Sequence, residues 1–129
     1  MSIRVLIVDD VAELRALYKV ALSHGDIEIV GEAADGFEAV EQTQALRPDV
    51  VLLDIAMPNM DGLAAIPKLK SAHPAVKILC LSGFASQSLA EQALARCAND
   101  YLEKGAHIDT IVSKLHKVVK APPKVNCPK

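Results

Sequence analysis

The chain has 129 residues, of which 51% are hydrophobic and 23% are charged, and its formal net charge at pH 7 is −2. This length and composition predict one globular domain that is large enough to bury a core without disulfides or metal ions as staples. The slightly acidic balance argues against a surface for nucleic acid or anionic lipid, and no apolar run approaches the roughly 20 residues that a membrane-spanning helix needs.

Five mainly apolar stretches predict β-strands, which begin near Ile3, Ile27, Val50, Val76 and Asp100. The steps between these starts are 24, 23, 26 and 24 residues, which leaves room for one helix after each strand and is typical of βαβ units. Three runs are almost wholly apolar, as in strands covered on both faces: Val5–Val8, Val50–Leu53 and Ile78–Leu81. Glu28 and Glu32 alternate with apolar residues and predict an edge position for the second strand. We therefore predict an α/β fold of the (βα)5 type, a doubly wound parallel five-stranded sheet with strand order 2-1-3-4-5.

The expected helices follow the strands. Asp10 and Glu13 form a capping-box pattern before an apolar stripe at Leu14, Leu17, Ala21 and Leu22. Asp35 is expected to open the next helix, which must end before Pro48. The last helix carries the i, i+3, i+4, i+7 stripe of an amphipathic helix, at Ile108, Ile111, Val112, Leu115, Val118 and Val119.

Two segments break these patterns. Pro67 falls inside the expected third helix at Ala64–Leu69, where a proline removes one backbone donor and can cost about 3 kcal/mol. That helix is therefore expected to bend or to begin late. After Lys120, the segment 121–129 contains three prolines and no periodicity. We assign residues 1–120 to one domain and residues 121–129 to a tail or a truncated linker.

Polar side chains follow four of the predicted strands, each at the point where an apolar run stops. They are Asp9 and Asp10, Asp54, Ser82 and Lys104. Because the carboxyl ends of parallel strands meet along one edge of an open sheet, and ligands bind there, we expect these side chains to share one pocket.

Three carboxylates in one pocket either take up protons or bind a cation. Two carboxylates about 4 Å apart repel each other by roughly 4 kcal/mol at an effective dielectric constant near 20. Oxygen ligands without histidine or cysteine favour Mg²⁺ over zinc. Asp54 is the candidate phosphoryl acceptor because it is the single aspartate after the central strand and a carboxylate can form an aspartyl phosphate, while Lys104 and Ser82 would complete a clamp on the phosphoryl group. Taken singly, Asp10 could be a helix cap and Lys104 a solvated surface charge.

Four segments in order resemble a known family, the receiver domain of two-component response regulators, which has a flavodoxin-like fold. The most specific segment is Asp54-Ile-Ala-Met-Pro-Asn-Met-Asp-Gly62, which is similar to the phosphoacceptor segment of that family. The other three are Val8-Asp9-Asp10, Leu81-Ser82-Gly83 and Tyr101-Leu-Glu-Lys104. The resemblance extends from Ile3 to about Lys120.

The resemblance implies a phosphorylation-dependent signalling switch and not an enzyme, with only self-catalysed phosphotransfer and autodephosphorylation. Asp54 would accept a phosphoryl group from a phosphohistidine of a sensor histidine kinase or phosphotransfer protein. Asp10 and Asp54 would bind Mg²⁺ directly, together with the backbone carbonyl of Ala56, and Asp9 would act largely through bound water.

The resemblance also implies how the switch would work. Lys104 would pair with the phosphoryl oxygens, and Ser82 would donate a hydrogen bond to another of them and shift towards the site. Tyr101 matches the aromatic residue that turns inward when the hydroxyl residue moves. The response would appear on the surface formed by the fourth helix, fifth strand and fifth helix, where a downstream protein target or a second copy of the chain would bind.

Two residues depart from the family pattern. Many receivers have a proline in a cis peptide after the lysine, but here Gly105 follows, so a cis bond is not expected. Cys97 stands where the family usually has glycine at a helix end, and a positive φ there would strain its backbone.

Three other functions are compatible with this fold. A Mg²⁺-dependent phosphohydrolase also works through an aspartyl phosphate, but such enzymes commonly have a second aspartate two residues after the nucleophile, where this chain has Ala56. An interaction module that is never phosphorylated would be expected to lack one of the site residues. A flavin-binding protein would need a small, hydroxyl-rich loop after Val8, where this chain has two aspartates.

The remaining features concern where the protein acts. No signal-peptide pattern occurs at the amino terminus, and Cys80, Cys97 and Cys127 form no C-x-x-C pair. We therefore expect reduced thiols, a cytoplasmic location, and neither a membrane nor a nucleic-acid partner.

Overall fold

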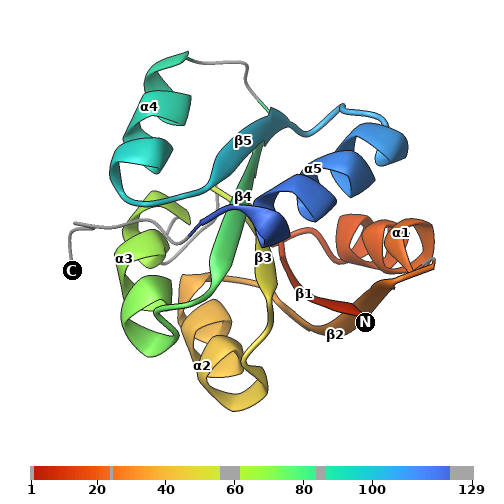
Figure 1. Cartoon of the computed structure of the whole chain (residues 1–129), viewed down its shortest axis with the longest axis horizontal. Coiled ribbons are helices and arrows are strands. Elements are labelled where there is room, and N and C mark those ends of the chain that lie inside the picture. Colours follow the sequence, from red (N-terminus) through yellow and green to blue (C-terminus); the bar gives the residue numbers. More distant parts are fainter. Residues whose placement is uncertain (1, 24, 56–61, 84–86, 123–129) are drawn as a thin grey trace.

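The computed structural model describes residues 2–23, 25–55, 62–83 and 87–122, in which strands and helices alternate (Figure 1). The strands are β1 (Ile3–Val8), β2 (Ile27–Ala33), β3 (Val50–Asp54), β4 (Lys77–Ser82) and β5 (Asp100–Glu103). The helices are α1 (Ala12–Leu22), α2 (Gly36–Leu46), α3 (Gly62–Ala72), α4 (Gln87–Ala95) and α5 (Ile108–Lys120). No helix within these ranges is long and apolar enough to cross a membrane.

The strands form one parallel sheet in the order β2-β1-β3-β4-β5, which confirms the predicted order. β2 lies at the edge, as its glutamates indicated. Its pairing with β1 is irregular, because Val5 pairs with Ile29 but the next residue, Leu6, pairs with Gly31. This bulge changes which face of the sheet each later residue of β2 occupies.

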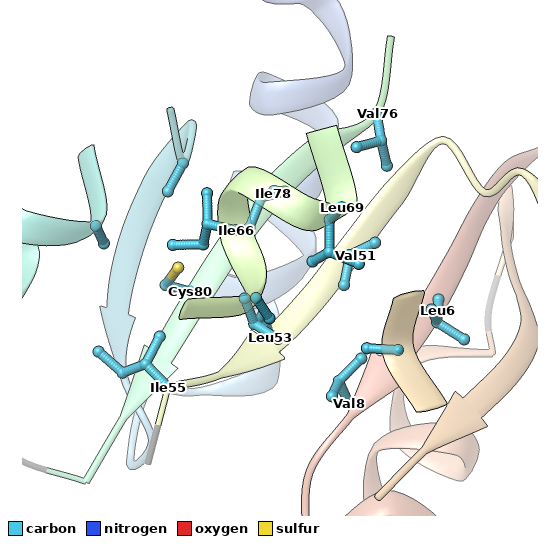
Figure 2. Close-up of a cluster of buried hydrophobic side chains, with 14 of the residues drawn as sticks. Leu6, Val8, Val51, Leu53, Ile55, Ile66, Leu69, Val76, Ile78 and Cys80 are labelled. Carbon is cyan, nitrogen blue, oxygen red and sulfur yellow. The ribbon is translucent and has the colours of Figure 1, made fainter. Parts of the chain in front are cut away.

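Side chains alternate along the strands between two separate core clusters. One cluster lies against α2, α3 and α4 and takes Leu6, Val8, Val51, Leu53, Ile78 and Cys80 from the sheet (Figure 2). The other lies against α1 and α5 and takes Ile3, Val5, Ile7, Val50, Leu52, Leu79 and Leu81. Figure 1 shows the same division, with α1 and α5 on one side of the sheet and the other three helices opposite. The sheet is therefore doubly wound and covered on both faces, as predicted.

The start of α1 differs from the prediction. The N-cap is Val11, which has no side-chain cap, so the expected cap by Asp10 is wrong. The preceding aspartate forms the local bond instead, because Asp9 Oδ1 accepts a hydrogen bond of 2.9 Å from the Val11 N–H. Asp10 is left exposed and without a capping role.

The buried stripe of α1 is also shifted from its predicted position. Leu14, Tyr18 and Leu22 face the sheet at intervals of four residues. Leu17, which we expected in the stripe, is 56% exposed because it lies one residue, or about 100°, away from Tyr18 around the helix. Tyr18 therefore takes the core position.

The bounds of α2 agree with the sequence. Asp35 Oδ1 accepts a hydrogen bond from the Glu38 N–H, and Glu38 Oε1 accepts one from the Ala34 N–H, at 2.9 and 2.8 Å. Asp35 is therefore the N-cap residue, as predicted, and Glu38 bonds to the residue before the cap, which differs from a capping box, where this bond goes to the N–H of the cap itself. The helix ends at Leu46, and Arg47 adopts a left-handed conformation with φ of 48° before Pro48.

Pro67 lies inside α3, which extends from Gly62 to Ala72. The expectation that this helix begins late is therefore wrong. Pro67 has no N–H to donate to the carbonyl of Leu63, but the inner face of the helix is fully buried through Ala65, Ile66 and Leu69. Each fully buried large aliphatic side chain contributes roughly 1.5–3 kcal/mol, which offsets the missing hydrogen bond.

Cys97 follows α4 with φ of 80°, so a residue other than glycine does occupy a left-handed position there. Cys97 is disulfide-bonded, which corrects the expectation of reduced thiols at this position, whereas Cys80 is free. Burial raises the pKa of the Cys80 thiol to about 12. Cys127 lies outside the described residues. No cis peptide bond occurs in the described ranges, which include Gly105.

Candidate functional site

Three of the predicted site residues lie at the carboxyl ends of β1, β3 and β5. Ile7, Leu52 and Leu102 belong to or pack against the core cluster on the α1 and α5 side. Asp9, Asp54 and Lys104 each come two residues later, so the alternation of side chains along a strand directs them to that same side. Because these strand ends share one edge of the sheet, their side chains meet.

Lys104 joins the two aspartates. Its Nζ lies 2.9 Å from Asp54 Oδ2, with a hydrogen bond, and 3.1 Å from Asp9 Oδ2. The side chains of the two aspartates are 1% and 2% exposed, and that of Lys104 is 23% exposed. Burial alone would lower the pKa of Lys104, but the carboxylates of Asp54 and Asp9 outweigh it, so that its pKa is raised. The ammonium is thus charged at neutral pH.

Asp10 completes the acidic cluster from the exposed side. One carboxylate oxygen each of Asp9, Asp10 and Asp54 lies within 4.8 Å of the other two. Asp9 Oδ2 is buried and forms an ion pair with Lys104 but has no hydrogen-bond partner within the described ranges. A buried carboxylate oxygen with spare acceptor capacity, beside two further carboxylates, is the donor set that Mg²⁺ prefers. The residues present therefore fit the predicted ion.

Ser82 and Tyr101 occupy neighbouring strands beside this cluster. Ser82 is buried at the end of β4, and its carbonyl accepts a hydrogen bond of 2.7 Å from the Lys104 N–H. Tyr101 pairs with Cys80 in the sheet and packs, partly buried, against the core cluster on the α2 to α4 side. Ser82 comes two residues after Cys80, so the alternation places both candidate switch residues on the same face of the sheet.

One predicted ligand is not placed by the structure. The backbone carbonyl of Ala56 and most of the segment that resembles a phosphoacceptor loop lie outside the described residues. The structure brings together Asp9, Asp10, Asp54 and Lys104, with Ser82 on the adjacent strand end.

Two further residues contribute to the structure of the site, and the sequence had not indicated a role for either of them. Gly62, the first residue of α3, sits so close to β3 that an added Cβ would lie 2.4 Å from Ile55 Cα and 2.6 Å from the Asp54 carbonyl oxygen. Tyr18 is buried below the pocket, and burial, followed by the nearby Asp9 carboxylate, raises the pKa of its phenol. The position of Gly62, eight residues after the candidate acceptor, was a possible signal for its role. The apolar pattern of α1 gave no signal for Tyr18, because it placed Leu17 in the buried stripe instead.

The comparisons with known proteins agree with this geometry. The family model of the response regulator receiver domain matches residues 5–116, a range that includes all the residues of the acidic cluster and Lys104. The chemotaxis protein CheY of Thermotoga maritima is 38% identical over 120 residues, which cover 93% of this chain and 100% of that protein.

Solved structures are similar over almost the whole chain. The response regulator domain of Thermotoga maritima CheB has a TM-score of 0.88 at 30% sequence identity, covering 95% of this chain and 100% of that one. A chain of the CheX-CheY-BeF3-Mg²⁺ complex from Borrelia burgdorferi has a TM-score of 0.85 at 25% identity, covering 92% of this chain and 90% of that one.

Proposed function

Because the chain belongs to the family of response regulator receiver domains, we propose that it is a signalling switch in which Asp54 accepts a phosphoryl group from a phosphohistidine. Receiver domains of two-component systems act generally as phosphorylation-dependent switches. The observation that carries the proposal is the position of Asp54, buried at the end of the central strand and hydrogen-bonded to Lys104. The donor would be a sensor histidine kinase or a phosphotransfer protein.

In the proposed step, the phosphorus atom exchanges its bond to the donor nitrogen for a bond to an oxygen of Asp54. A carboxylate oxygen of Asp54 attacks the phosphorus, a P–O bond forms, and the P–N bond to the donor imidazole breaks. The imidazole nitrogen leaves with the electron pair and takes up a proton. Lys104, which already lies 2.9 Å from Asp54 Oδ2, would then pair with the new phosphoryl oxygens, and Ser82 would donate to another.

Receiver domains generally bind Mg²⁺ at an acidic pocket, and here Asp9, Asp10 and Asp54 would hold it. When bound, the ion supplies positive charge that offsets the negative charge of the transferring phosphoryl group. The presence of Mg²⁺ in the complex from Borrelia burgdorferi supports this part of the proposal. Asp9, already bonded through Oδ1 to the Val11 N–H, has Oδ2 directed to the pocket.

We further propose that residues 1–120 are the switch and that 121–129 are a tail or truncated linker. The output would be the surface of α4, β5 and α5, which would bind a downstream protein or a second copy of the chain. The choice of this output surface is supported by the hydrogen bond from the Lys104 N–H to the Ser82 carbonyl, which joins the ends of β4 and β5 next to the residue that would pair with the phosphoryl group.

The proposal is tested by phosphoryl incorporation from acetyl phosphate with and without Mg²⁺. We expect about one hydroxylamine-labile phosphoryl group per wild-type chain in the presence of Mg²⁺ and none in Asp54→Asn. Asp109→Asn, which changes an exposed aspartate in the first turn of α5, is the matched control and should behave as wild type. Equal labelling of Asp54→Asn and wild type would exclude Asp54 as the acceptor. Steady turnover of a simple phosphoester would instead indicate a phosphohydrolase.

Tyr101→Ala is expected to separate phosphorylation from its structural response. Tyr101 packs against the core cluster on the α2 to α4 side of the sheet, whereas the side chains of Asp54 and Lys104 are directed to the α1 and α5 side, so the loss of Tyr101 should leave labelling within about twofold of wild type. The amide resonances of β5 and α4 that shift on phosphorylation should shift by less than half as much in the variant, because the side chain that couples the two conformations is absent. Equal shifts in both proteins would contradict a role for Tyr101 in the switch.

A further inference from the structure

A charged pair outside the acidic cluster holds the backbone of that cluster in place. Arg15, in the first turns of α1, donates through Nη1 to the carbonyl oxygen of Asp9 at 2.6 Å and through Nε to Glu32 Oε1 at 2.7 Å. The guanidinium therefore connects the loop after β1 to the end of β2 by two hydrogen bonds of fixed relative direction. The sequence singled out Glu32 only as a sign of an edge strand, and it did not single out Arg15.

The Asp9 backbone is fixed on both sides. Its N–H donates to the carbonyl of Ala33 at 3.0 Å, its carbonyl accepts from Arg15, and its Oδ1 accepts from the Val11 N–H. The carbonyl of Asp9 belongs to the peptide plane that leads into Asp10. The bond from Arg15 consequently sets the direction in which the chain presents Asp10, the exposed member of the cluster.

The bulge in β2 places Glu32 where Arg15 can reach it. Glu28 pairs with Arg4, which lies on the face of the sheet that α2 covers. In a regular strand Glu32, four residues later, would lie on that same face. Because the register shifts after Val5, Glu32 pairs instead with Ile7, which faces α1. A bulge that turns a side chain towards a functional site is a common use of this irregularity.

Glu32 is held by two cations of α1, at 2.7 Å from Arg15 and 2.8 Å from Lys19. These hydrogen bonds, with that of Lys19 the larger, lower the pKa of Glu32. Its side chain is 37% exposed, so solvent screens the charges and the main effect of the contact is to orient the guanidinium. Arg15 itself is 16% exposed.

We propose that Arg15 and Glu32 are positioning residues, which orient Asp9 and Asp10 for binding a divalent cation. This inference rests on the proposed function of the acidic cluster. A positive guanidinium close to a cation site weakens binding by electrostatics alone, so its benefit there has to come from geometry. Glu32 both orients Arg15 and offsets its charge.

Two variants that change charge in opposite directions test the proposal. Arg15→Met removes a positive charge, and Glu32→Ala removes a negative one. If the pair acts by positioning, both variants should bind Mg²⁺ about tenfold more weakly than wild type, as is typical when a residue that supports a metal ligand is lost. If it acts only through charge, Arg15→Met should bind more tightly and Glu32→Ala more weakly. Titration calorimetry of the folded proteins gives the dissociation constants.

Lys19→Met is the matched control, because Lys19 contacts the same glutamate but not Asp9. It should bind Mg²⁺ within about twofold of wild type. Opposite signs for the two main variants, or affinities equal to that of wild type, would overturn the proposal.

A second readout does not depend on Mg²⁺. In the ion-free protein, amide hydrogen exchange of Asp9 and Val11 should be at least about tenfold faster in Arg15→Met and Glu32→Ala than in wild type, because the peptide plane between Asp9 and Asp10, which lies between these two amides in the chain, loses the bond from Arg15. Wild-type protein that fails to bind Mg²⁺ would contradict the proposed function. Unchanged exchange would contradict the positioning role, so the two failures are distinguishable.

Discussion

Replacing Lys104 by methionine is expected to lower the free energy of unfolding by about 3 kcal/mol in Mg²⁺-free buffer at pH 7. Lys104 lies within 3.1 Å of both Asp9 and Asp54, whose side chains are almost completely buried. Methionine retains the length of the side chain but leaves two buried carboxylates without a cation. Removing one partner of a buried ion pair costs more than the pair itself contributes, because the remaining charge stays desolvated.

Chemical denaturation of wild type, Lys104→Met and Lys117→Met measures this loss. Lys117 is exposed in the last turn of α5, so its variant should remain within about 0.5 kcal/mol of wild type. Addition of 10 mM Mg²⁺ should stabilise Lys104→Met more than wild type, because the ion takes over the neutralisation of the carboxylates. A loss of stability that Mg²⁺ does not reduce would show that Lys104 does not balance the charge of Asp9 and Asp54.

The sheet and its candidate site were predictable because both depend on a short-range pattern. Apolar runs covered on both faces specify central parallel strands, and a polar residue directly after each run marks the edge where ligands bind. Asp54 and Lys104 are 50 residues apart, yet the alternation along β3 and β5 and the strand order are enough to predict their meeting.

What could not be predicted depends on contacts between elements. Asp10 is of a residue type that often caps helices. In the structure, however, Asp9 accepts the hydrogen bond of the Val11 N–H, and α1 begins at Ala12. Where α1 begins also determines which of its side chains face the sheet, and in the structure Tyr18 is buried there whereas Leu17 is exposed. Likewise, no periodicity reveals the register shift in β2 that turns Glu32 towards α1, because a bulge is decided by the pairing of two strands.

Gly62→Ala is expected to lower the free energy of unfolding by about 3 kcal/mol, at the upper end of the usual cost of overpacking. An alanine Cβ would lie 2.4 Å from Ile55 Cα and 2.6 Å from the Asp54 carbonyl oxygen, and neither backbone atom can turn away as a side chain can. β3 is paired on both sides, with β1 and β4, so the strand cannot yield without loss of sheet hydrogen bonds. The Gly62 N–H also donates to the Ile55 carbonyl at 3.2 Å, which fixes the start of α3.

Helix propensity predicts the opposite sign for this substitution, since alanine is favoured over glycine in helices by up to about 1 kcal/mol. Gly83→Ala is the matched control, because an added Cβ there meets nothing within 4 Å. Denaturation of both variants at 25 °C should show a loss only for Gly62→Ala, and its folded fraction should also accept less phosphoryl group from acetyl phosphate, since the displaced backbone carries Asp54. Stability equal to or above wild type would mean that α3 can move away from β3 without cost. The loss would instead identify Gly62 as the residue that lets α3 approach β3 closely enough to hold Asp54 in place.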